Sequence, residues 1–202
     1  MDINPFDAIV VGSGATGGVA ALTLAEQGIR VLLIEAGPQI ERTEASSNEP
    51  KDTLNRLSGI FSQKHTNQSQ HPGYWKNNPN LYSNELNHPY SQPKNKPFLW
   101  TQGMQYGGRS LTWGGITLRF SPDDFHPSRK DGYGPDWPIS YDELSPHYDF
   151  IEKFCGIYGQ KDNIAEVPNG KYIGEIPLTN NEIIFGNQVK SKLNYPFIQS
   201  RG

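Results

Sequence analysis

The chain has 202 residues, of which 35% are hydrophobic and 11% aromatic, so it can bury a core and is neither collagen-like nor wholly disordered. Its 18 basic and 21 acidic residues give a formal net charge of -3, which excludes the positive field that would gather nucleic acid or anionic lipid. The single cysteine, Cys155, excludes an internal disulfide and a Cys/His zinc site, and we expect no bound metal. No basic segment precedes the first apolar stretch, and glycines soon interrupt that stretch. We therefore expect no membrane segment and a cytoplasmic location.

The first 38 residues predict a compact strand–helix–strand unit. Residues 8–11 and 31–34 form short apolar runs, as expected for strands that are buried on both faces of a parallel sheet. Between them, residues 15–27 consist mostly of helix-forming side chains. Gly28 then stands where a glycine lets the chain leave a helix through a left-handed turn.

Three glycines follow the first strand at the spacing of a dinucleotide-binding loop. Gly12 allows a tight turn, Gly14 lets the backbone approach a pyrophosphate, and Gly17 lets the helix pack on the strand. Glu35 ends the second strand, where a carboxylate can accept hydrogen bonds from both ribose hydroxyls and disfavours a 2′-phosphate. The combination predicts dinucleotide binding. It leaves NAD and FAD open, and the glycines alone are also compatible with a plain strand–turn–helix.

The middle of the chain contains a polar stretch and a glycine-rich stretch. Residues 62–97 are rich in Pro and Asn, which predicts a long irregular connection. The sequence GMQYGGRSLTWGGITLRF, residues 103–120, places five glycines around Trp113, so its backbone could lie against a flat ligand. A glycine-rich loop between strands is the alternative for this second stretch.

The C-terminal part predicts helices. Ser140 and Glu143 have the spacing of a capping box, and Ser145-Pro146 predicts a second helix start with Pro at the first helical position. An apolar stripe that ends at Cys155 predicts that this thiol is a small buried hydrophobic group.

Four motifs in this order resemble the N-terminal part of the glucose-methanol-choline (GMC) oxidoreductases, in the branch of gluconate- and fructose-dehydrogenase-like flavoproteins. They are G-S-G-A-T-G-G in the first loop, I-E-A-G from Ile34, G-G-R-S-L-T-W-G-G from Gly107, and D-W-P-I-S-Y-D-E-L from Asp136. The resemblance implies FAD, held at its pyrophosphate by Gly12, Ser13, Gly14, Thr16 and Gly17 and at its adenosine ribose by Glu35. It also implies that the second glycine segment lies beside the isoalloxazine, through Gly107, Gly108, Ser110, Thr112, Trp113 and Gly114.

The fold implied by the resemblance is α/β: a Rossmann-like FAD-binding fold whose incomplete parallel sheet has flanking helices, followed by the start of a substrate domain. Residues 1–38 would be the βαβ dinucleotide-binding unit and residues 39–98 an irregular excursion or lid. Residues 99–122 would cover the flavin, and residues 123–202 would form a helical segment and the start of the substrate domain.

The implied activity is oxidation of a CH–OH group of an alcohol, polyol or sugar by hydride transfer to flavin. Relatives that attach the flavin covalently carry a His before the tryptophan, whereas this chain has Thr112, so we expect noncovalent FAD. The family's catalytic His lies near the end of a longer chain. We therefore expect an N-terminal fragment without a catalytic residue of its own, inactive alone and completed by a C-terminal chain. The alternatives are a non-catalytic truncated nucleotide-binding product and an NAD-dependent dehydrogenase.

Overall fold

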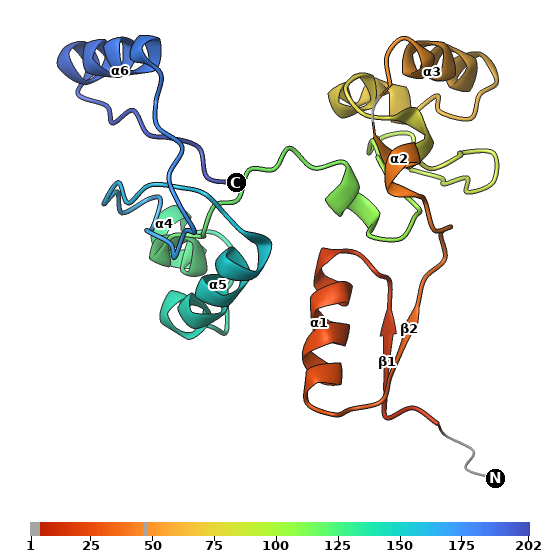
Figure 1. Ribbon diagram of the computed structural model, residues 1–202, viewed down its shortest axis with the longest axis horizontal. Helices are drawn as coiled ribbons and strands as arrows, with labels where there is room; N and C mark the ends of the chain where they lie inside the picture. The colour runs from red at the N-terminus through yellow and green to blue at the C-terminus, as the bar shows by residue number, and fades with distance from the viewer. Residues whose placement is uncertain (1–4, 47) are drawn as a thin grey trace. The chain divides into compact units, whose positions relative to one another are not determined.

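A computed structural model describes residues 5–46 and 48–202 of the chain (Figure 1). The chain divides into two compact units, which we call the first unit (Met1–Trp113) and the second unit (Gly114–Gly202). None of the helices within the described residues has both the length and the apolar character needed to cross a membrane.

The first unit begins with the predicted βαβ arrangement. Strand β1 (Ala8–Val11), helix α1 (Ala15–Glu26) and strand β2 (Val31–Ile34) follow one another, and the two strands pair in parallel (Figure 1). The helix ends one residue before its predicted end, and Gly28 follows with φ +80°, in the left-handed region that glycine adopts readily. The predicted strand–helix–strand unit is thus confirmed to within one residue.

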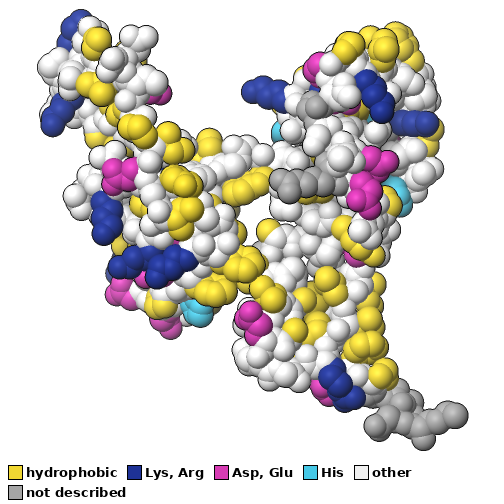
Figure 2. Space-filling view, in the orientation of Figure 1, with side chains coloured by type: hydrophobic (Ala, Val, Ile, Leu, Met, Phe, Trp, Pro, Cys, Tyr) yellow, Lys and Arg dark blue, Asp and Glu magenta, His cyan; other side chains and the backbone are white. Residues whose placement is uncertain are grey.

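The parallel pair is an incomplete sheet within the described residues. It contains only β1 and β2, and side chains that a doubly covered sheet would bury are open to solvent. Ile9 is 64% exposed and Val11 is 80% exposed, and hydrophobic side chains reach the surface along the strand pair (Figure 2). The α/β class with an incomplete parallel sheet, as implied by the resemblance, is confirmed.

Residues 39–98 hold more local structure than their polar composition suggests. Helix α2 (Arg42–Ala45) and helix α3 (Lys51–Phe61) come first. Short 3-10 helices then follow at Gln68–Gln70, Pro72–Trp75 and Pro79–Leu81. A small core of Tyr74, Leu81 and Tyr82 holds these turns together.

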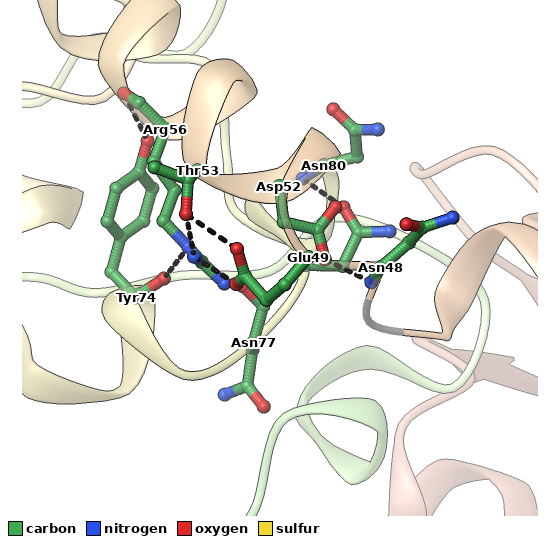
Figure 3. A network of polar contacts seen from close by, with 9 residues as sticks. Asn48, Glu49, Asp52, Thr53, Arg56, Tyr74, Asn77 and Asn80 are labelled. Atoms are coloured by element: carbon green, nitrogen blue, oxygen red, sulfur yellow. Dashed lines mark hydrogen bonds and ion pairs between the residues drawn. The ribbon is translucent and has the colours of Figure 1, made fainter.

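Buried polar groups complete this core. The guanidinium of Arg56 donates to the carbonyl oxygens of Tyr74, at 3.1 Å, and Asn77, at 2.9 Å, and it pairs with Glu49 (Figure 3). The hydroxyl of Tyr74 donates back to the carbonyl oxygen of Arg56 at 3.1 Å. The bonds from Arg56 satisfy backbone acceptors in the turns at Tyr74 and Asn77, so a polar segment can still pack.

The regular elements of the second unit are helices. A 3-10 helix (Pro122–Phe125) and helices α4 (Pro127–Asp131), α5 (Tyr141–Cys155) and α6 (Asn180–Leu193) follow in order. The predicted capping box at Ser140 and Glu143 is present at the start of α5.

In the first unit, the second glycine segment contains Gly107 and Gly108 and leads into a 3-10 helix (Gly108–Leu111).

The second unit is organised around the buried side chain of Arg119. Its Nε donates to Oε1 of Glu152 at 2.8 Å, and its Nη2 donates to Oε2 of Glu152 and to Asp149, both at 2.6 Å. Its Nη1 donates to the hydroxyls of Tyr141, at 3.3 Å, and Ser145, at 3.4 Å. The carboxylates beside Arg119 raise its pKa further above its ordinary value.

This network explains why the prediction of a second helix start at Ser145-Pro146 was wrong. Pro146 lies inside α5, where it removes one backbone hydrogen bond at a cost of about 3 kcal/mol. Arg119, however, binds side chains of α5 on both sides of the proline and holds the helix together as one element.

The prediction of a buried Cys155 was also wrong. The thiol is exposed, and the neighbouring Phe154 is 56% exposed. The buried position at this end of α5 belongs to Glu152, which is 3% exposed and faces Arg119. The face that α5 buries is therefore set by a polar partner and not by the apolar stripe.

Candidate functional site

The first glycine loop has an open face. Gly12 has φ +91°, and its N–H donates to the carbonyl oxygen of Ile34 at 2.7 Å, which fixes the loop to the end of β2. A Cβ atom at Gly17 would collide with the carbonyl oxygen of Gly12, so this position tolerates only glycine. A Cβ atom at Gly14 would meet nothing within 4 Å. Gly17 therefore serves the packing of α1 on the loop, whereas Gly14 leaves room for a ligand.

The N-terminus of α1 is suited to an anion. Gly14 is its N-cap residue and supplies no capping side chain, and the first turn contains no acidic residue. The leading N–H groups of a helix carry a partial positive charge and favour phosphate oxygens. The open space at Gly14 lies at this helix end, so the residues present fit a diphosphate group.

Glu35 is held at the same loop. Its Oε2 accepts hydrogen bonds from the backbone N–H of Ser13, at 2.8 Å, and from the Ser13 hydroxyl, at 2.6 Å. Its Oε1 accepts from the N–H of Gly37 at 2.9 Å. These bonds, led by that of the Ser13 hydroxyl, lower the pKa of Glu35 to about 2. The carboxylate is therefore ionised at neutral pH and can only accept, as recognition of ribose hydroxyls requires.

The second glycine segment packs against the first loop within the first unit. The N–H of Gly107 donates to the Ser13 hydroxyl oxygen at 3.2 Å. A Cβ atom at Gly108 would lie 3.4 Å from Cα of Gly14, so the two backbones are close neighbours. The structure thus brings together two segments that are far apart in the sequence. We call the contact between the first glycine loop and the second glycine segment the junction.

The remaining residues predicted to contact the flavin or the pyrophosphate have different local surroundings. Ser110 donates to the carbonyl oxygen of Gly107 at 2.6 Å and so stabilises the local turn. The carbonyl oxygen of Thr112 accepts from the Asn77 side chain at 3.4 Å. Trp113 is 53% exposed, and Gly114 is the first residue of the second unit. Thr16 lies in the first turn of α1.

Sequence reasoning missed one part of the junction. A Cβ atom at Gly37 would collide with the backbone of Met104, and the N–H of Tyr106 donates to the carbonyl oxygen of Pro38 at 3.1 Å. Gly37 is thus required for close packing after β2. The signal was present in the I-E-A-G motif, although that motif does not say which segment approaches the glycine.

A helix N-terminus suited to an anion, an open glycine loop and an ionised carboxylate after β2 are the features expected of a Rossmann-type dinucleotide-binding unit. Residues 7–78 match the family model described as an FAD binding domain. This match and the relatives described next support the FAD-binding part of a GMC oxidoreductase, with FAD as the cofactor.

Two curated relatives and one solved structure illustrate the match. The large subunit of fructose dehydrogenase from Gluconobacter japonicus is 27% identical over 83% of this chain and 28% of the relative. Paromamine 6'-oxidase from Streptomyces fradiae is 30% identical over 80% of this chain and 25% of the relative. Pyridoxine 4-oxidase from Mesorbium loti is 20% identical, with a TM-score of 0.46, over 92% of this chain and 32% of that chain. The chain spans about a quarter of the length of the two curated relatives.

Substitution of Glu35 tests its place in the site. We expect Glu35→Ala to weaken FAD binding by about 1–3 kcal/mol, because ribose hydroxyls lose a charged acceptor. Fluorescence titration of the full-length protein with FAD measures this loss. Glu26→Ala, at the exposed end of α1, is the matched control and should bind FAD like the wild type. Equal affinity of the Glu35 and Glu26 variants would remove Glu35 from the site.

The pH dependence follows from the sign of the Glu35 shift. The pKa falls from an ordinary 4.5 to about 2, so the folded state gains stability above 4.5 and loses that gain as the pH falls toward 2. We expect urea unfolding of the wild type to show this loss between about pH 4.5 and 2, and Glu35→Ala to show less of it. Identical pH profiles would contradict the assignment.

Proposed function

We propose that the whole protein oxidises a CH–OH group of an alcohol, polyol or sugar and that this chain supplies its FAD-binding part. The observation that carries the proposal is the packing of the second glycine segment on the first, through the 3.2 Å bond between Gly107 and Ser13. This junction would place the second glycine segment over a cofactor bound at the first glycine loop. The relatives named above as a dehydrogenase and an oxidase support the same reaction class.

In this proposal each segment has a separate task. The N–H groups at the start of α1 and the open face of Gly14 bind the pyrophosphate, and the ionised Glu35 accepts from the ribose hydroxyls. The segment from Gly107 to Gly114 lies beside the flavin ring and excludes water from it. When bound, FAD supplies the acceptor for a hydride from the substrate carbon. Binding is noncovalent, because Thr112 offers no imidazole for a covalent link.

The remaining parts of the reaction would come from outside the FAD-binding part. We propose that the chain has four successive parts. They are the βαβ unit 1–38, the excursion or lid 39–98, the flavin-covering segment 99–122, and residues 123–202, which begin the substrate domain. A base that removes the hydroxyl proton would come from a C-terminal segment or a complementing C-terminal chain. A cytoplasmic location remains part of the proposal, consistent with the single cysteine.

Anaerobic reduction of the flavin tests the proposed activity. The FAD-loaded full-length protein is mixed with a panel of sugars, polyols and alcohols while flavin absorbance is followed. We expect bleaching with at least one compound and none with residues 1–202 alone. FAD retention without bleaching by any compound would favour the non-catalytic nucleotide-binding product, and reduction of added NAD in place of the flavin would favour the NAD-dependent dehydrogenase.

A further inference from the structure

The Ser13 hydroxyl connects three segments of the first unit. It donates to Oε2 of Glu35 at 2.6 Å and accepts from the N–H of Gly107 at 3.2 Å. The backbone N–H of Ser13 donates to the same Oε2 at 2.8 Å. One small side chain thus joins the first glycine loop, the residue that follows β2 and the second glycine segment.

The chemistry of the three groups fixes the direction of these bonds. A hydroxyl has one O–H donor and two acceptor lone pairs, and an ionised carboxylate can only accept. The Ser13 O–H must therefore point to Glu35, which leaves a lone pair for the N–H of Gly107. A hydroxyl that donates to an anion is polarised and becomes a better acceptor, so the two bonds strengthen each other.

We infer that Ser13 is a positioning residue that couples recognition of the adenosine ribose at Glu35 to placement of the second glycine segment. The inference rests on the proposed function. The resemblance assigned Ser13 to the pyrophosphate, whereas in this structure both of its donors are directed to Glu35. A ligand that holds Glu35 in place also holds the Ser13 hydroxyl, and through it the N–H of Gly107.

The close approach of the two glycine segments explains why this bond matters. Gly107 has φ +83° and Gly108, the first residue of the 3-10 helix, has φ +54°, so both adopt the left-handed backbone region that favours glycine. The Gly107–Ser13 bond is a long-range hydrogen bond that keeps Gly108 against Gly14. Without the hydroxyl, the junction retains contact but loses the bond that ties it to the ribose carboxylate.

Hydrogen exchange of the full-length protein tests the coupling in the absence of any cofactor. We expect peptides covering residues 104–111 to exchange about tenfold faster in Ser13→Ala than in the wild type, because the acceptor of the Gly107 N–H is lost. Ser13→Thr keeps the hydroxyl and should restore slow exchange. Ser69→Ala removes an exposed hydroxyl that donates to the carbonyl oxygen of Thr66, and it should leave residues 104–111 unchanged.

Addition of ADP then tests the direction of the coupling. ADP carries the adenosine ribose and no flavin, so we expect it to protect residues 104–111 in the wild type and in Ser13→Thr. In Ser13→Ala we expect ADP to protect residues 12–17 without protecting 104–111, and FAD affinity to fall about tenfold. Equal exchange of residues 104–111 in the wild type and Ser13→Ala, with or without ADP, would overturn the inference. If no variant binds ADP or FAD, the proposed function fails, whereas the cofactor-free comparison still decides the role of Ser13.

Discussion

Gly14→Val should abolish measurable FAD binding while leaving the fold intact. A Cβ atom at this position meets no protein atom within 4 Å, so a side chain can leave the backbone here without a clash at Cβ. The same space lies at the N-terminus of α1, where the pyrophosphate would approach the backbone. We expect the affinity for FAD to fall by at least about 100-fold, or about 2.7 kcal/mol.

The measurement pairs flavin content with thermal unfolding of the full-length protein. Gly14→Val should unfold near the temperature of the cofactor-free wild type and carry no flavin. Gly18→Ala, one turn further along α1, is the control, since a Cβ atom there meets only the carbonyl oxygen of Ser13 at an ordinary 3.8 Å. Normal flavin content in Gly14→Val would show that the cofactor does not approach this glycine.

Arg119→Ala should destabilise the second unit by about 3–5 kcal/mol, because removal of one member of a buried ion pair leaves the other without compensation. Glu152 is 3% exposed and, among the described residues, would keep the backbone N–H of Lys171, at 2.6 Å, as its donor. Asp149 would lose its bond to the same guanidinium. Urea unfolding of the full-length protein, with proteolysis of the second unit as the readout, measures the effect.

Two variants control this experiment. Arg119→Lys keeps the charge but loses the planar fork that binds Glu152 through two nitrogens, so we expect an intermediate loss of stability. Arg129→Ala removes an exposed side chain from α4 and should change stability by less than about 0.5 kcal/mol. If Arg119→Ala unfolds at the same urea concentration as Arg129→Ala, the buried network does not stabilise the second unit.

The βαβ unit could be predicted from the sequence because its information is local. Two short apolar runs, a helix-forming stretch and Gly28 define β1, α1 and β2 without reference to the rest of the chain. The second unit is different, since the buried face of α5 depends on Arg119, which lies outside the helix. A pattern of apolar residues could not reveal that partner, and this led to the errors at Pro146 and Cys155.

The polar middle of the chain shows a second limit of sequence patterns. The core around Tyr74 depends on hydrogen bonds from Arg56 to backbone carbonyl oxygens, which leave no trace in hydrophobic periodicity. Helix α3 was not predicted, although Leu54, Leu57 and Phe61 have helical spacing. These apolar side chains are exposed, and the helix buries Asp52, Arg56 and Gly59 instead. Sequence patterns find cores made of apolar faces more easily than cores completed by buried polar groups.

The candidate site also has one part that local sequence patterns predict and one part that they do not. The spacing of Gly12, Gly14 and Gly17 and the position of Glu35 follow from local motif chemistry. The contact between Ser13 and Gly107 joins residues that are 94 positions apart, and no local pattern predicts it. Only the resemblance to a family suggested that a second glycine segment would lie near the cofactor.

That separation in sequence also bears on the order in which the chain folds. Glu35 reaches Ser13 by closing a loop of 22 residues, whereas Gly107 must close one of 94, which is about two doublings and costs about 1.2 kcal/mol more in chain entropy. Contacts between near neighbours in sequence form early, and distant ones wait for slower closure. The difference in closure entropy therefore favours formation of the nucleotide loop before the second glycine segment packs on it, and this order would leave the loop accessible to an incoming cofactor during folding.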